Sequence, residues 1–383
     1  MSESFPEVLI VGGGPAGSAL GIALARRGRE VVLLEQSAAA HHKVCGEFLS
    51  YEAVGYLESL GLPPRALGAV AIHGVRLHAR TTIAACALPF SALSLTRFAL
   101  DEALLTLALR EGVEVHRGWR VESLTQTQYG WQARATGGEE HSARAVFLAT
   151  GKHDLSSYRR PRGTQNNLVG FKMYFRLTVA QRQALDGWVE LFLFPGGYAG
   201  LQMVEGEQTN LCLLVTREWL ARCGGAWAAL LAHMRGASQP LAERLDGATP
   251  LLAKPLAVSS IPYGMLPGNA ADGLWRLGDQ AAVIPSFAGD GMAMALHGAL
   301  LSAEMYERGA DAAEFAQAMR AQYCTQVQLA TAISRIMVSA PAAAQAARLW
   351  PGLMGRIAAR TRIPLAARKT AVPEMRHNGA GQV

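Results

Sequence analysis

A glycine-rich turn near the N-terminus constrains this chain of 383 residues more than any other feature. The turn covers residues 12–17, follows a short apolar, β-rich run at 7–11 and opens a helix-favouring stretch at 15–27. Residues 30–34 form a second β-rich run that ends at Glu35. Two apolar runs separated by a helical stretch predict a βαβ unit with parallel strands.

The spacing within this turn fits G-x-G-x-x-G. The first glycine permits a tight turn, the second leaves bare backbone where a pyrophosphate can approach the helix N-terminus, and the third lets helix and strand pack closely. An acid about 20 residues further on binds ribose hydroxyls. The alternative is an ordinary glycine turn. We predict a dinucleotide site made by Gly12, Gly14, Pro15, Ala16, Gly17 and Glu35.

The same fingerprint serves NAD and FAD, and a second motif late in the chain favours FAD. Leu277-Gly278-Asp279 is followed by Pro285 and by a Gly289-Asp290-Gly291-Met292 run that opens a helix. With this pair of motifs the chain resembles the FAD-dependent family of para-hydroxybenzoate hydroxylase-type monooxygenases and geranylgeranyl reductases. The resemblance implies that Asp279 binds a ribityl hydroxyl, and that the amides of Gly291 and Met292 face the flavin's pyrimidine edge.

Three further stretches extend the resemblance. Arg97 opens a run that looks like the family's R-x-x-[FL]-D-x-x-L helix start, which implies that Arg97 lies along the FAD phosphate and ribityl path. Val121 stands where the family's backbone contacts adenine. Residues 149–154 read A-T-G-K-H-D where the hydroxylases carry G-A-D-G. This departure weakens the transfer of the pyridine-nucleotide role proposed for that motif and leaves open how, or whether, NAD(P)H binds.

The segment Lys43-Val44-Cys45-Gly46-Glu47 is similar to the reductase branch, which has a C-G-E-like run beside the flavin. Cys45 could donate a proton or line the flavin face, and Glu47 could shift the pKa of the thiol. The alternative is a small apolar residue in a tight turn. We therefore take Cys45 and Glu47 as candidate catalytic residues.

The order of segments predicts an α/β fold: a Rossmann-type FAD-binding domain with an inserted antiparallel-sheet substrate domain and C-terminal helices. The FAD-binding domain is expected at 1–165 and 270–310, with an antiparallel excursion near 70–90. The substrate domain is expected at 166–269 and a helical lobe with its tail at 311–383.

Three groups of residues in these segments leave alternatives open. Bulky side chains alternate along the inferred sheet and form either its core or a chamber wall. Lys172 points either into the chamber or outward, and we expect outward. His41 and His42 are adjacent and are expected in a solvent-exposed loop, so no metal site is predicted.

Charge and cysteine content exclude several classes of protein. The last 60 residues carry eight basic residues and one acid, whereas the rest of the chain is close to neutral. This distribution argues against nucleic-acid binding and leaves the basic tail as a possible weak contact with a membrane surface or a protein. Five scattered cysteines without a C-x-x-C pair indicate neither disulfides nor zinc and favour the cytoplasm.

The function expected first is an NAD(P)H-dependent monooxygenase acting on an apolar or aromatic small molecule. NAD(P)H would be a transient electron donor to FAD, and oxygen transfer would take place in a dry pocket. The alternatives are a geranylgeranyl reductase-like C=C reductase and a non-catalytic flavin-bearing partner protein. The lysine and W-x-W-x-I-P signatures of flavin halogenases are absent.

Overall fold

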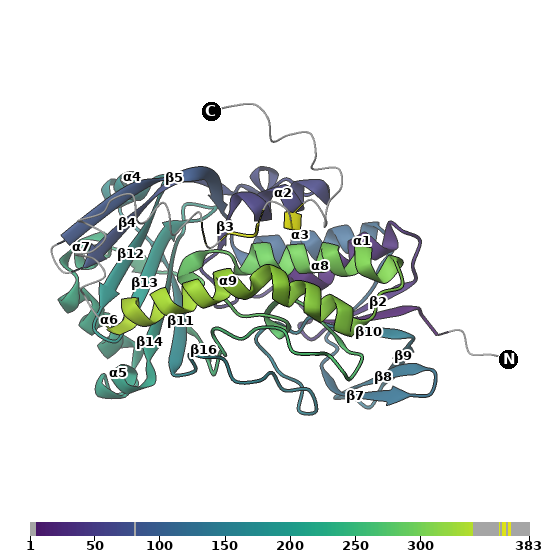
Figure 1. The fold of residues 1–383 in the computed structure, drawn as a ribbon. Coiled ribbons are helices and arrows are strands. Elements are labelled where there is room, and N and C mark those ends of the chain that lie inside the picture. Colours follow the sequence, from purple (N-terminus) through teal and green to yellow (C-terminus); the bar gives the residue numbers. More distant parts are fainter. Residues whose placement is uncertain (1–4, 80–81, 340–359, 361, 365–366, 369–383) are drawn as a thin grey trace.

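A computed structural model describes residues 5–79, 82–339, 360, 362–364 and 367–368. These residues form two main sheets, a small third sheet, and helices that cover both main sheets (Figure 1). The α/β fold predicted from the sequence is confirmed. The domain boundaries stay a prediction.

The first sheet is parallel and has the strand order β17-β10-β1-β2-β6. Its centre forms because β1 and β2 are short, uninterrupted apolar runs whose residues are all buried. The register pairs Val8 with Val31 on one side and with Ala145 on the other. The strands are β1 Val8–Val11, β2 Val31–Glu35, β6 Glu114–Arg117, β10 Ala145–Leu148 and β17 Trp275–Arg276.

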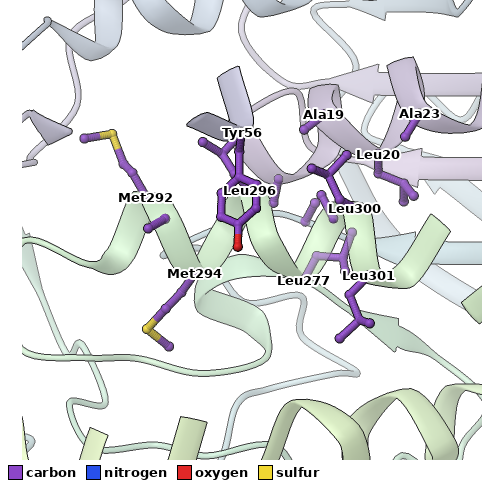
Figure 2. Packing of buried hydrophobic residues seen from close by; sticks show 14 of the residues in the cluster. Ala19, Leu20, Ala23, Tyr56, Leu277, Met292, Met294, Leu296, Leu300 and Leu301 are labelled. Atoms are coloured by element: carbon purple, nitrogen blue, oxygen red, sulfur yellow. The ribbon is translucent and has the colours of Figure 1, made fainter. Parts of the chain in front are cut away.

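The two faces of this sheet are covered differently. Helices α1 (Pro15–Ala25), α3 (Arg97–Arg110) and α8 (Gly291–Glu307) pack on one face with residues such as Ile10 and Leu33. Figure 2 shows side chains of α1 and α8 meeting Tyr56 of α2 (Tyr51–Ser59) in this core. On the other face lies the third sheet, made of β7 Val121–Thr127, β8 Gly130–Ala135 and β9 Glu140–Ala143.

The second main sheet has the order β15-β11-β14-β13-β12-β4-β5-β3, and β16 pairs with β11. The predicted excursion near 70–90 belongs to it, because β4 pairs in parallel with β12. The strands are β3 Phe48–Leu49, β4 Val70–Ala79, β5 Thr82–Ser94, β11 Leu168–Arg176, β12 Trp188–Phe194, β13 Gly197–Met203, β14 Thr209–Thr216, β15 Thr249–Pro250 and β16 Leu256–Ser259.

One face of this sheet packs against short helices and forms a closed core. Most of the alternating bulky residues, including Phe171, Met173 and Phe192, lie in this core with Leu230 and Met234 of α6. Of the two alternatives, these residues therefore form the core and not a chamber wall. Tyr198 lies on the opposite face of the sheet. The helices nearby are α4 Val179–Leu185, α5 Arg217–Arg222, α6 Trp227–Ala237 and α7 Gln239–Arg244.

Helix α9 (Ala312–Ser339) runs past both main sheets and contacts β12, β13 and β17 (Figure 1). Most of the predicted helical lobe and tail beyond residue 339 lies outside the described residues. Short 3-10 helices complete the fold: η1 Pro64–Leu67, η2 Gly278–Gln280 and η3 Ser286–Ala288. No helix of the described part is long and apolar enough to span a bilayer.

Candidate active site

The glycine-rich turn has the geometry that its spacing predicts. Gly12 has φ +110°, and a Cβ there would lie 2.5 Å from the Ala149 carbonyl oxygen. A Cβ on Gly17 would lie 1.9 Å from the Gly12 carbonyl oxygen, so Gly17 permits the close packing of helix on strand. Both positions are therefore fixed by contacts within the protein.

Gly14 is the open position of the turn. It is the N-cap of α1, and no side chain caps that helix. A Cβ on Gly14 would approach only the Arg97 guanidinium, at 3.4 Å. The amides of the first turn of α1 and a nearby cation therefore border open space, an arrangement that suits an anionic group.

Glu35 closes the turn from the second strand. Its two carboxylate oxygens accept hydrogen bonds from the backbone N–H of Gly13 at 2.7 Å and of Ser37 at 2.9 Å. These bonds hold the carboxylate at the end of β2, and its remaining lone pairs are available to a ribose.

One elongated cavity of about 980 Å³ connects these groups with the late motif. It is lined by every sequence-predicted site residue except Gly17, whose role is in packing. The lining residues include Gly12, Gly14, Pro15, Ala16, Glu35, Cys45, Glu47, Arg97, Val121, Asp279, Gly291 and Met292. These residues come from widely separated stretches of the chain, which the fold brings together.

Arg97 lines the cavity and is fixed by Asp101, one helical turn further along α3. Its guanidinium donates two hydrogen bonds to that carboxylate, at 2.6 and 2.8 Å. Lys43 lies 3.1 Å from the same carboxylate. Burial lowers the pKa of the Arg97 guanidinium, but Asp101 outweighs this effect, and the pKa lies above its ordinary value. Arg97 therefore stays charged.

The late motif faces the far part of the cavity. The Asp279 carboxylate has no hydrogen-bond partner among the described residues, whereas its backbone carbonyl accepts a bond from Arg160. Gly291 begins α8, whose N-cap Asp290 makes no capping side-chain bond. An uncommitted carboxylate and an uncapped helix start are the groups that a ligand with hydroxyls and a polarised ring edge could use.

The Lys43–Glu47 stretch holds a buried ion pair that the sequence did not predict. Glu47 and Lys172 are both fully buried, and Lys172 Nζ lies 2.5 Å from Glu47 Oε1. The same oxygen accepts hydrogen bonds from the Tyr174 hydroxyl at 2.7 Å and the Arg97 backbone N–H at 2.8 Å. The expectation that Lys172 points outward is wrong, because both faces of β11 are covered.

Two features show how tightly Glu47 is held. Its backbone has φ 62°, a left-handed conformation that is rare for residues other than glycine. Burial raises the pKa of the Glu47 carboxyl, and the interaction with Lys172 and the Tyr174 hydrogen bond oppose that rise. The strained backbone persists because the bonds around it fix its position.

Other polar side chains bind the backbone carbonyls of residues 43–46. Lys172 donates to the Lys43 carbonyl at 3.1 Å, and Lys152 donates to the Val44 carbonyl. Asn210 donates to the carbonyls of Cys45 and Gly46 at 3.1 and 3.0 Å. Lys152, Lys172 and Asn210 come from distant stretches, so no local spacing could have revealed them.

These bonds present Cys45 to the cavity. Its Sγ accepts a bond from the Glu47 backbone N–H at 3.4 Å, and the side chain is half-buried. Cys45 and Glu47 both line the cavity, but the Cys45 side chain packs partly against the core of α1, α2 and α8, whereas the Glu47 carboxylate is bound to Lys172.

Part of the cavity lining is apolar. It includes Val258, Ile261, Tyr263, Val283 and Ile284, from β16 and the loops that precede η3. The Tyr198 hydroxyl lies 3.1 Å from the Ser286 hydroxyl next to this part of the lining. An apolar molecule could rest here beside the late motif.

The two neighbouring histidines have different surroundings. His41 is exposed, but His42 is only partly so, because its ring packs between Phe98 and Tyr174 with centroids 4.9 Å away. The expectation of a fully exposed loop is wrong for His42. No group of three potential metal ligands occurs in the part of the chain that the structure describes.

Comparison with known proteins agrees with this geometry. Residues 6–159 match the family described as FAD binding domain. The chain is 25% identical over 324 residues to a menaquinone reductase of Mycolicibacterium smegmatis, covering 79% of this chain and 76% of that protein. It is 33% identical over 129 residues to mouse squalene monooxygenase, covering 32% of this chain and 21% of that protein.

The fold also matches that of the halogenase PltM, solved in complex with phloroglucinol and FAD. The TM-score is 0.74 at 15% sequence identity, and the match covers 91% of this chain and 80% of PltM. The motifs, the cavity and the matched domain lead to one assignment. This protein carries an FAD binding domain at residues 6–159 and is an FAD-dependent enzyme.

Proposed function

We propose that the protein is an NAD(P)H-dependent monooxygenase that hydroxylates an apolar or aromatic small molecule. The observation that carries the proposal is the single cavity that is lined both by the FAD-type motifs and by apolar side chains. A substrate on these side chains would lie beside the late motif and away from bulk water.

The residues present fit FAD. The uncapped start of α1 at Gly14 and the Arg97 guanidinium suit a pyrophosphate, Glu35 suits the adenosine ribose, and the uncommitted Asp279 carboxylate suits a ribityl hydroxyl. When bound, FAD supplies two-electron redox chemistry and the activation of oxygen.

The chain's own residues supply binding, orientation and exclusion of water. Ile261, Val283 and Ile284 would hold an apolar ring by shape and keep the site dry. The first amides of α8 would favour negative charge on a ring edge nearby. Lys172 and Glu47 would fix the stretch that carries Cys45 at the border of the same cavity.

A second function, reduction of a C=C bond, is favoured by the position of Cys45. Cys45 lines the cavity on a stretch held by bonds to four consecutive carbonyls, as a positioned proton donor requires. The similarity to a menaquinone reductase over most of the chain supports this alternative. In this case Cys45 would donate a proton to one carbon of the C=C bond, and the other carbon would receive the hydride.

Anaerobic and aerobic turnover separate the two functions. The FAD-loaded protein is first mixed with NADH or NADPH without oxygen, and reduction is followed at 450 nm. Oxygen is then added with a panel of phenols, phloroglucinol included, and in parallel with isoprenoid quinones and polyprenyl compounds. The monooxygenase proposal predicts incorporation of labelled oxygen from ¹⁸O₂ into a phenolic product.

Reduction of a polyprenyl or quinone substrate without oxygen, and without label in any product, would replace this proposal by the reductase. Cys45→Ser distinguishes the two further. It should leave hydroxylation nearly unchanged but slow C=C reduction about a hundredfold or more with FAD bound. Cys86→Ser, on β5 and outside the cavity lining, is the matched control.

A further inference from the structure

The C-terminal segment around Arg362 lies against the wall of the flavin cavity. Arg362 Nη1 is 2.6 Å from Asp290 Oδ1, and only 8% of the Arg362 side chain and 1% of the Asp290 side chain are exposed. Asp290 is the N-cap of α8, between Gly289 and Gly291, which both line the cavity. The ion pair therefore lies next to two residues that line the cavity, Gly289 and Gly291.

Aromatic side chains enclose the same guanidinium. It lies 4.3 Å from the ring centroid of Phe90 and 5.9 Å from that of Phe48. Phe48 lines the cavity and packs closely on Gly289, since a Cβ on Gly289 would lie 2.6 Å from its ring. A second bond, at 3.4 Å, joins Arg362 to the Ala288 carbonyl. Arg362 thus contacts the turn and the aromatic residue that supports it.

The rest of the described C-terminal segment anchors it on the body of the protein. Ile363 is buried in the core that contains α1, α2 and α8, and Arg368 pairs with Glu52 of α2 at 2.5 Å. Figure 1 shows this segment, in yellow, beside α2. Arg362 and Arg368 are committed to buried or partly buried acids, and so the segment is part of the active-site architecture.

We propose that Arg362 is a positioning residue that sets the reduction potential of the bound FAD. Its charge neutralises Asp290, which would otherwise place a negative charge behind the start of α8. A two-electron-reduced flavin carries negative charge at its pyrimidine edge, the edge that Gly291 and Met292 are proposed to face. An unneutralised Asp290 would therefore destabilise reduced FAD relative to oxidised FAD.

This inference rests on bound FAD and not on the identity of the substrate. The potential of the bound flavin is measured by reductive titration against a dye of known potential, and FAD affinity by reconstitution of the apoprotein. Arg362→Gln should weaken binding of reduced relative to oxidised FAD at least tenfold, which lowers the two-electron potential by about 30 mV. Asp290→Asn removes the acid and leaves the cation, so its potential should rise.

Further variants separate charge from packing. The double variant Asp290→Asn/Arg362→Gln lacks both charges. Its affinity for reduced FAD relative to oxidised FAD should therefore lie within about threefold of the wild-type ratio. Arg362→Lys keeps the charge and should shift the potential less than Arg362→Gln. Arg368→Gln is the control for loss of a neighbouring cation: Arg368 pairs with Glu52, which also lies 3.8 Å from Arg362, and its potential should shift less than that of Arg362→Gln because the pair with Asp290 is kept.

Opposite shifts for the two single variants would establish the role of charge, because loss of packing alone moves both in the same direction. The inference is overturned by an unchanged potential in Arg362→Gln, or by equal shifts in Arg362→Gln and Arg368→Gln. If Arg362→Gln does not fold, the sign of the shift in Asp290→Asn decides. A wild-type protein that binds no FAD would instead contradict the cofactor assignment and the proposed function.

Discussion

The buried pair of Lys172 and Glu47 gives the sharpest test of how the active site is held together. Lys172→Met keeps much of the side-chain volume but removes the cation 2.5 Å from a fully buried carboxylate. Loss of one partner of such a pair costs about 3–5 kcal/mol, because the remaining charge is buried without compensation. We expect the free energy of unfolding of the FAD-loaded protein to fall by about this amount.

The loss should depend on pH, and its sign follows from the Glu47 carboxyl. Burial raises its pKa, and Lys172 is the main group opposing the rise, so the pKa rises further in Lys172→Met. The folded variant then binds a proton that the unfolded chain releases above about pH 4.3. Its stability should therefore fall as pH rises towards the folded pKa, by up to about 1.4 kcal/mol per pH unit, and level off above it.

Urea unfolding followed by tryptophan fluorescence at pH 5 and pH 8 measures both effects. The double variant Glu47→Gln/Lys172→Met removes both charges and should recover part of the stability and lose the added pH dependence. Lys254→Met, at a position where no ion pair is found in the described residues, controls for loss of a lysine. A loss below about 1 kcal/mol in Lys172→Met, equal at both pH values, would refute the reasoning.

Three further predictions concern the cofactor site and the core. Gly14→Val directs methyl groups from the open position of the turn toward the Arg97 side of the cavity. FAD retention should therefore fall more than tenfold, while stability against urea stays nearly unchanged. Retention of one FAD per chain would contradict the role of Gly14. Asp279→Ala should raise the Kd for FAD roughly tenfold, measured by reconstitution, without loss of folding, since its carboxylate bonds to no other described residue; unfolding before flavin loss would point to a structural role. Burial lowers the pKa of His297 to about 4, so the folded protein binds fewer protons than the unfolded chain between pH 6.5 and 4. Stability should fall by about 3 kcal/mol as pH drops through this window, and His297→Gln should remove this part of the slope in urea titrations.

The local parts of the fold could be predicted because their physics is local. A glycine turn between apolar runs, an acid at a strand end and alternating apolar residues each determine a nearby conformation. The strands around Val8 and Val31 and the helix that begins at Arg97 follow these patterns. The fold also places the two motifs, some 260 residues apart in the chain, on one cavity.

The contacts that hold the Cys45 stretch could not be predicted, because they join distant residues. Lys172 lies in an apolar strand, and its direction depends on whether the second face of the sheet is covered. Only the tertiary structure shows that Glu47 lies there to receive it. Asn210 and Lys152 are similar cases, since a single polar residue on a strand or loop carries no local signal of its partner.

The charge of the C-terminal tail did not predict that some of its arginines pair with acids of the same protein. The tail for which the sequence predicted a possible membrane or protein contact lies mostly outside the described residues, and so this contact stays a prediction. Arg362 and Arg368, however, pair with Asp290 and Glu52 on the protein's own body. Charge counts along a chain do not distinguish a free cation from one that neutralises a buried acid.

Titration of the apoprotein with FAD and, separately, with FMN tests the central claim most directly. The Gly14 turn, Glu35 and Arg97 form the part of the cavity suited to the adenosine and pyrophosphate half of FAD, which FMN lacks. We predict that flavin fluorescence is quenched to saturation at one FAD per chain and that FMN binds at least a hundredfold more weakly. Equal affinity for FMN, or no saturable binding of FAD, would contradict the account.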